Sequence, residues 1–118
     1  MTRQLVEVAL FTDDVDAARR FYERLLGGPP EAEWPGGAIF AAGSVKLLVH
    51  ERSPQTERGW PPDEDHVAFA VADVDSACDE LRALGLALLV QPRDFSWGRS
   101  AYLRDPDGRL VELVQAES

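Results

Sequence analysis

The chain has 118 residues, of which 45% are hydrophobic, and a formal net charge of −9. This length and apolar content suit one globular domain, and the negative charge disfavours nucleic acid, because phosphate binding needs a concentrated basic face. There is no apolar stretch long enough to cross a bilayer and no signal-peptide pattern at the start. Cys78 is the only cysteine, so we expect a reduced, cytoplasmic setting.

The first half of the chain predicts a strand, a helix and three further strands. Residues 4–12 alternate between apolar and polar types, as in a half-buried strand. Asp13 or Asp14 is expected to cap the helix, because a short acidic side chain accepts hydrogen bonds from the free amides of the first turn. Gly27 and the residues after it, Gly28-Pro29-Pro30, end that helix. Strand-like runs follow at 32–34, 38–42 and 45–49.

The second half predicts the same order of elements. Residues 51–64, rich in proline and charge, are typical of a surface linker. Residues 66–72 alternate as a strand, Asp73 is expected to cap a second helix, and Gly85 ends it. Three strand-like runs complete the half at 86–91, 99–104 and 110–115. The Asp105–Gly108 segment between the last two runs predicts a tight turn.

The two halves are also related in sequence. Residues 7–25 align without a gap with residues 66–84, and the later segment 43–49, GSVKLLV, is similar to 108–114, GRLVELV. Each half therefore predicts a βαβββ module, and the repeat places Glu7 at the position equivalent to His66.

Three segments give the chain a resemblance to a known family: FTDDVDAARRFYERLLG, DHVAFAVADVDSA and WGRSAYLRDPDGRLVELVQ. With the doubled βαβββ pattern, the chain resembles the vicinal oxygen chelate superfamily, which includes glyoxalase I, bleomycin-resistance proteins and extradiol dioxygenases. The resemblance implies an α+β fold in which two tandem βαβββ modules form a curved mixed sheet around a cavity, with helices outside. It implies one domain over 1–118, with modules at about 3–50 and 65–116 joined by the 51–64 linker. It also implies a homodimer.

Metal-using members of this superfamily carry their ligands on the first and last strands of each half. Carried over to this chain, the ligand positions are Glu7, His66 and Glu112, and the fourth, aligned with Glu112, is Leu47, which cannot bind a metal. One imidazole and two carboxylates suit a divalent ion such as Zn, Fe, Mn or Ni. His50 lies three residues past Leu47, so in a regular strand it points to the opposite face, and we interpret it as a surface histidine.

Each of the three ligand candidates also has a structural interpretation. Glu7 could be solvated on a sheet edge, and His66 could be a hydrogen-bonded core histidine. Glu112 alternates with apolar residues, where a carboxylate is costly unless it is paired or bound to a metal. An arginine, Arg99 or Arg104, could supply that pairing.

The aromatic residues Trp97, Tyr102 and Phe40 are candidates for a ligand pocket, although aromatics are equally common in a core. The resemblance and the ligand set favour a metal-dependent enzyme of glyoxalase or dioxygenase type acting on a small molecule, with Glu112 and Glu7 as catalytic carboxylates. The alternative is a metal-free protein that sequesters an aromatic or cationic drug by stacking and charge attraction. Neither interpretation involves nucleic acid or a membrane.

Overall fold

The computed structural model of the protein describes residues 3–52 and 63–116. The chain forms two compact units, one from Glu7 to Asp65 and one that joins the first six residues to the chain from His66 onward. Most of the predicted 51–64 linker lies outside the described residues. Among the described residues, no helix has the length and apolar character that a membrane span requires.

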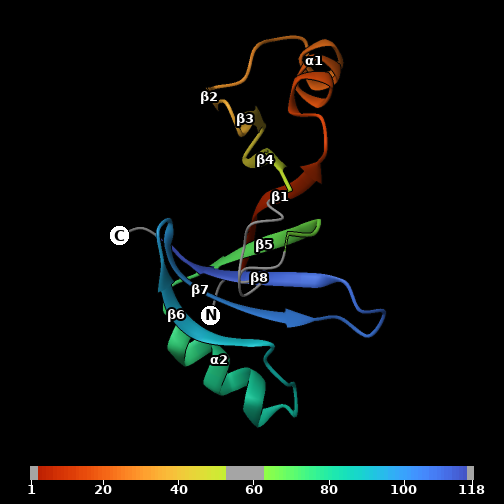
Figure 1. Ribbon diagram of the computed structural model, residues 1–118. Coiled ribbons are helices and arrows are strands. Elements are labelled where there is room, and N and C mark those ends of the chain that lie inside the picture. Colours follow the sequence, from red (N-terminus) through yellow and green to blue (C-terminus); the bar gives the residue numbers. More distant parts are fainter. Residues whose placement is uncertain (1–2, 53–62, 117–118) are drawn as a thin grey trace. The chain divides into compact units, whose positions relative to one another are not determined.

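The Glu7–Asp65 unit is a βαβββ module. Its elements are β1 (Gln4–Thr12), of which residues 7–12 belong to this unit, α1 (Val15–Leu26), β2 (Ala32–Trp34), β3 (Gly37–Ala42) and β4 (Val45–Glu51). The strands are ordered β2-β3-β4-β1, with β1 parallel to β4 and the other neighbours antiparallel. Helix α1 contacts β3 and β4 (Figure 1).

The second unit has the same topology. Its elements are β5 (His66–Val71), α2 (Val74–Ala83), β6 (Val90–Phe95), β7 (Gly98–Arg104) and β8 (Leu110–Gln115). The order is β6-β7-β8-β5, with β5 parallel to β8, and α2 contacts β6, β7 and β8 (Figure 1). The predicted α+β fold of two βαβββ modules with a mixed sheet is therefore confirmed.

One predicted strand is displaced. The apolar run at 86–91 predicted a strand there, but β6 begins at Val90 and continues to Phe95. The first residues of the apolar run lie before the strand. Of these, Leu86 and Leu89 are exposed, and Leu88 packs against the core beneath α2. The alternation from Val90 onward is broken by a register shift between Val90 and Arg93, which hid the strand in the sequence.

Both helices begin at the acidic caps that the sequence predicts. The Oδ1 atom of Asp14 accepts a hydrogen bond from the Ala17 amide at 3.0 Å, and Oδ1 of Asp73 accepts one from the Asp75 amide at 3.1 Å. Helix α1 ends at Gly27, whose φ of 81° is a left-handed conformation that favours glycine. The repeat in sequence thus encodes a repeat of local structure.

Each helix covers a separate apolar core. Beneath α1 the buried residues are Ala38, Phe40 and Val49, with Leu47 and Tyr22 packed against them. Beneath α2 the core contains Val71, Val74, Ala77, Cys78, Ala101 and Leu113. A third cluster, Val90, Tyr102 and Leu110, has Phe95 packed against it. Because Tyr102 follows Ala101 directly in β7, it points to the sheet face opposite α2.

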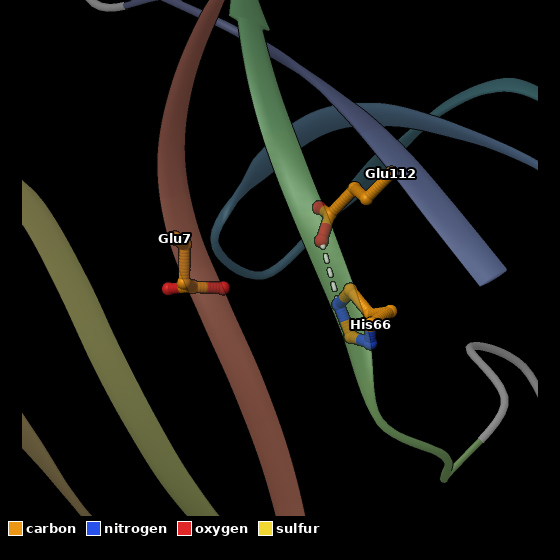
Figure 2. Close-up of side chains that lie close together, drawn as sticks. All are labelled: Glu7, His66 and Glu112. Atoms are coloured by element: carbon orange, nitrogen blue, oxygen red, sulfur yellow. Dashed lines mark hydrogen bonds and ion pairs between the residues drawn. The ribbon is translucent and has the colours of Figure 1, made fainter. Parts of the chain in front are cut away.

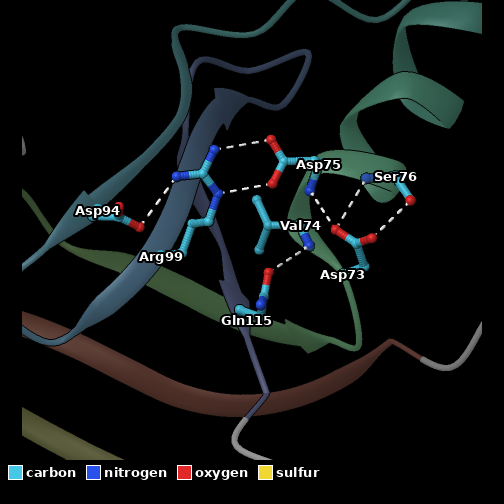
Figure 3. Close-up of polar contacts among 7 residues, drawn as sticks. All are labelled: Asp73, Val74, Asp75, Ser76, Asp94, Arg99 and Gln115. Atoms are coloured by element: carbon cyan, nitrogen blue, oxygen red, sulfur yellow. Dashed lines mark hydrogen bonds and ion pairs between the residues drawn. The ribbon is translucent and has the colours of Figure 1, made fainter.

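A polar network ties α2 to its sheet (Figure 3). Arg99 on β7 donates through Nε and Nη2 to the two carboxylate oxygens of Asp75, at 2.7 and 3.0 Å, and through Nη1 to Asp94 on β6 at 3.1 Å. The first amide of α2, from Val74, donates to the side chain of Gln115 at 3.1 Å. The N-terminal turn of α2 is therefore anchored to β6, β7 and β8.

Candidate metal centre

A histidine and a glutamate from neighbouring parallel strands meet on the sheet face opposite α2. His66 is the first residue of β5, and Glu112 lies on β8, where it pairs with Ala68. Since His66 and Ala68 are two residues apart, His66 and Glu112 project from the same face. His66 Nε2 and Glu112 Oε1 are 3.1 Å apart, and both side chains are 6% exposed (Figure 2).

The other oxygen of Glu112 has two hydrogen-bond donors. Oε2 accepts from the Ser100 hydroxyl at 2.8 Å and from the Trp97 indole Nε1 at 3.1 Å. The predicted alternative, an ion pair with an arginine, is not what holds this carboxylate. Arg99 binds Asp75 and Asp94 instead, and Arg104 donates to the carbonyl of Gly108.

Glu7 completes the set of three predicted ligands. It lies on β1 and is half-buried. Glu7, His66 and Glu112 each offer one ligand atom, and these atoms all lie within 4.8 Å of one another (Figure 2).

The donor set fits a divalent metal ion. Two ligand atoms that occupy neighbouring positions on one first-row ion, each about 2.1 Å from it, lie about 3 Å apart. His66 Nε2 and Glu112 Oε1 form a hydrogen bond at 3.1 Å, and this separation is also compatible with two ligands of one ion. Two carboxylates neutralise a doubly charged ion, and an imidazole with oxygen ligands suits Zn, Fe, Mn or Ni. Three protein ligands leave positions for water or substrate.

The position that corresponds to Glu112 in the first module is Leu48 and not the predicted Leu47. Leu48 pairs with Ala9 as Glu112 pairs with Ala68, whereas Leu47 pairs with Phe40 and packs beneath α1. The two similar segments follow turns of different length, because Ala42 pairs with Val45 but Arg104 pairs with Leu110. Both candidates are leucines, so the first module offers no ligand there.

His50 lies on the face opposite Leu47, as predicted. It pairs with Phe11, its ring lies 5.6 Å from that of Phe11, and its Nδ1 is 2.7 Å from the Glu51 carbonyl oxygen. Phe11 and Glu7 share one face of β1, but four residues of strand, about 13 Å, separate them. His50 is therefore beside an aromatic cluster and is not a fourth ligand.

The three predicted aromatic residues occupy different environments. Trp97 is 49% exposed and stacks on Phe95 with ring centroids 4.6 Å apart, and Tyr102 is buried with its ring edge-on to His66 at 5.9 Å. Phe40 instead packs beneath α1 with Tyr22. Because Phe40 pairs with Leu47, it lies on the helix-facing side of the sheet and belongs to the core.

Sequence reasoning missed Ser100, which is fully buried and bonded to Glu112. The alternation of side chains along the strand could have indicated it, since Ser100 and Tyr102 project from the same face of β7. A serine within an apolar strand rarely stands out unless the partner that satisfies its hydroxyl is known.

Known proteins share this fold and sequence pattern. The model of the Glyoxalase/Bleomycin resistance protein/Dioxygenase superfamily matches residues 4–113. A probable lactoylglutathione lyase from Synechocystis is 36% identical, covering 97% of this chain and 96% of the relative. Glutathione transferase FosA from Serratia marcescens is 29% identical, covering 96% and 81%.

Solved structures agree on the fold. Methylmalonyl-CoA epimerase from Mycobacterium tuberculosis superposes with a TM-score of 0.75 at 22% identity, covering 98% of this chain and 89% of the epimerase. A superfamily member from Vibrio splendidus superposes with a TM-score of 0.73 at 16% identity, covering 98% and 100%. With a family match along nearly its whole length, the chain belongs to the Glyoxalase/Bleomycin resistance protein/Dioxygenase superfamily.

Proposed function

We propose that the protein is a metal-dependent enzyme that acts on a small molecule through oxygen atoms of that molecule. Glu7, His66 and Glu112 are the proposed metal ligands. The observation that carries the proposal is the nearly complete burial of a carboxylate, Glu112, beside an imidazole and a second carboxylate. A buried negative charge is costly unless it is paired or coordinates a metal, and a divalent cation would supply that compensation.

The chain's own residues divide the work at this site. A bound divalent ion would polarise substrate oxygen atoms and stabilise negative charge that develops on them. Glu112 is nearly fully buried, and one of its oxygens is held by the Ser100 hydroxyl and the Trp97 indole, so we assign it a ligand role. Glu7 is more exposed than Glu112, so we assign it the transfer of a proton to or from the substrate.

We take the substrate class to be tested from the names of two relatives. Two of them are named as a lactoylglutathione lyase and a glutathione transferase, so conjugates of glutathione are the first compounds to screen. The predicted homodimer and cytoplasmic location belong to the same proposal, because each was implied by family resemblance or by the single cysteine.

A metal-free sequestering protein is the second candidate. The observation that favours it is the half-exposed Trp97 ring stacked on Phe95, which offers a surface for a flat ligand. Such a protein should bind an aromatic cation in the presence of excess chelator, with quenching of tryptophan emission. Loss of that binding on chelation would reject the sequestering function and favour the metal-dependent enzyme.

The test is elemental analysis of purified protein before and after loading with Zn, Mn, Fe, Ni or Co. We expect about one ion per chain, and loss of that ion in His66→Ala and in Glu112→Gln, since the first change removes the imidazole and the second removes the carboxylate charge. Glu33→Gln, a change of an exposed glutamate on β2, is the matched control and should keep the ion. Unchanged metal content and affinity in both ligand variants would refute the site.

A further inference from the structure

We propose that Ser100 and Trp97 are positioning residues, which fix the Glu112 carboxylate so that a single oxygen, Oε1, faces the metal. This inference rests on the proposed metal centre and adds to it two residues that do not themselves bind the ion. It also assigns Trp97 a second role, as a reporter of metal occupancy.

The two oxygens of the Glu112 carboxylate have different partners. Oε2 accepts both side-chain donors, from Ser100 and Trp97, while Oε1 lies 3.1 Å from His66 Nε2. Hydrogen bonds to an ionised carboxylate are roughly twice as strong as neutral ones. Rotation of the carboxylate would break both bonds in a buried place, so the two oxygens keep distinct roles.

The two donors, Ser100 and Trp97, are held in place by their surroundings. Ser100 is fully buried on β7, the strand that pairs with β8, and its indole neighbour Trp97 also donates to the serine hydroxyl at 3.2 Å. The Trp97 ring lies parallel to Phe95, with an interplanar angle of 4°, and Phe95 contacts Tyr102 edge-on. Both donors are therefore held by packing that does not depend on Glu112.

The strand that carries Ser100 is anchored from its other face. Arg99, which precedes Ser100, projects to the opposite face and binds Asp75 and Asp94. The backbone of β7 at this point is thus fixed from the side of α2 while the serine hydroxyl meets Glu112 on the other side. Partners of this kind, which orient a ligand without binding the metal, typically contribute tenfold to a hundredfold in metal affinity.

The indole links the metal centre to the surface. Trp97 lies between β6 and β7 and is half exposed, yet its N–H reaches the buried carboxylate. The positive charge of a cation bound at Glu112 would therefore change the electrostatic field at the indole. We expect the emission of Trp97 to change when the protein binds a metal ion.

The experiment measures the dissociation constant for Zn²⁺, by competition with a chromophoric chelator, together with tryptophan emission and the metal-free melting temperature. The variants are Ser100→Ala and Trp97→Phe, and the matched control is Trp34→Phe, another partly exposed tryptophan, on β2. We expect each site variant to raise the dissociation constant by about tenfold or more. The metal-free melting temperature should fall no further than in His66→Ala, which also removes one partner of buried Glu112. Trp97→Phe should also lose the emission change that Trp34→Phe keeps.

The outcomes separate this inference from the proposed function. If the unaltered protein binds Zn²⁺ and both site variants bind it within about twofold as tightly, the positioning role is refuted while the metal centre stands. If weaker binding appears only together with a fall in metal-free melting temperature larger than that of His66→Ala, the residues are structural and the positioning role is also refuted. If the unaltered protein binds no metal, the proposed function fails and this inference fails with it.

Discussion

His66 Nε2 and Glu112 Oε1 lie 3.1 Å apart although 46 residues separate them in the chain. The long separation is required by the topology, because β5 and β8 are parallel neighbours and parallel strands need a crossover connection. Here the crossover contains α2, β6 and β7. The crossover that connects β5 to β8 also contains Ser100 and Trp97, so elements of the whole second module contribute to the site.

The His66–Glu112 contact predicts an energetic coupling in metal-free protein. His66→Ala leaves Glu112 without one partner in a buried place, which should cost about 1–3 kcal/mol of unfolding free energy. When Glu112 is already replaced by Leu, the same histidine change should cost less, because no carboxylate then needs a partner. Urea unfolding of the two single variants and the double variant, in excess chelator, measures this difference. Additive effects of the two changes would show that the pair is not coupled.

Much of the fold could be predicted because the sequence repeat is local in origin. Asp14 and Asp73 cap helices through contacts within their own first turns, and β1 and β5 alternate in the usual way. The ligand candidates Glu7 and His66 could be found for the same reason, since they occupy equivalent positions on those strands. Features that depend on residues close together in the sequence could therefore be predicted from the sequence.

Features that depend on pairing between strands were harder to predict. The choice between Leu47 and Leu48 depends on the register of β4 against β1, and a one-residue slip moves a side chain to the other face. The aromatic character of Phe40 predicts a pocket residue, but its pairing with Leu47 places it in the core beneath α1. The hydrogen bonds of Ser100 and Trp97 to Glu112 require knowledge of three adjoining segments at once.

The two helix caps predict equal sensitivity in the two modules. Asp14→Ala and Asp73→Ala each remove an acceptor for first-turn amides and should each cost about 1 kcal/mol of unfolding free energy. Asp79→Ala, which removes an exposed carboxylate from α2 away from its first turn, is the control and should have a smaller effect. Chemical denaturation followed by circular dichroism measures all three. An effect of the cap variants no larger than that of the control would contradict the capping role.

Cys78 should be unreactive in the folded protein. It lies on the buried face of α2, and burial raises the pKa of its thiol, which disfavours the reactive thiolate. We expect a thiol reagent such as dithionitrobenzoate to label it at a rate set by unfolding, and to label it fully in denaturant. Fast labelling without denaturant would show that α2 separates readily from its sheet.

Arg99 should control the acid titration of Asp75. The hydrogen bond from Arg99 holds the pKa of the Asp75 carboxyl below its ordinary value of 3.8. Replacing Arg99 by Ala should therefore move this pKa back up toward 3.8, which an NMR titration of the side-chain carboxyl carbon reports directly. Arg20→Ala, a change on α1 in the other module, is the control and should leave the Asp75 titration as it was.

The same lowered pKa predicts how the stabilising effect of Arg99 depends on pH. Because the folded-state pKa of Asp75 is below its unfolded value, this contribution to stability is complete above 3.8 and is lost as the pH falls through the folded-state value. Urea midpoints of the unaltered protein and of Arg99→Ala should differ most near neutral pH and converge below 3.8. A gap that stayed constant to the lowest pH at which both proteins fold would mean that Arg99 stabilises the α2 anchor through packing of its side chain and not through the charge of Asp75.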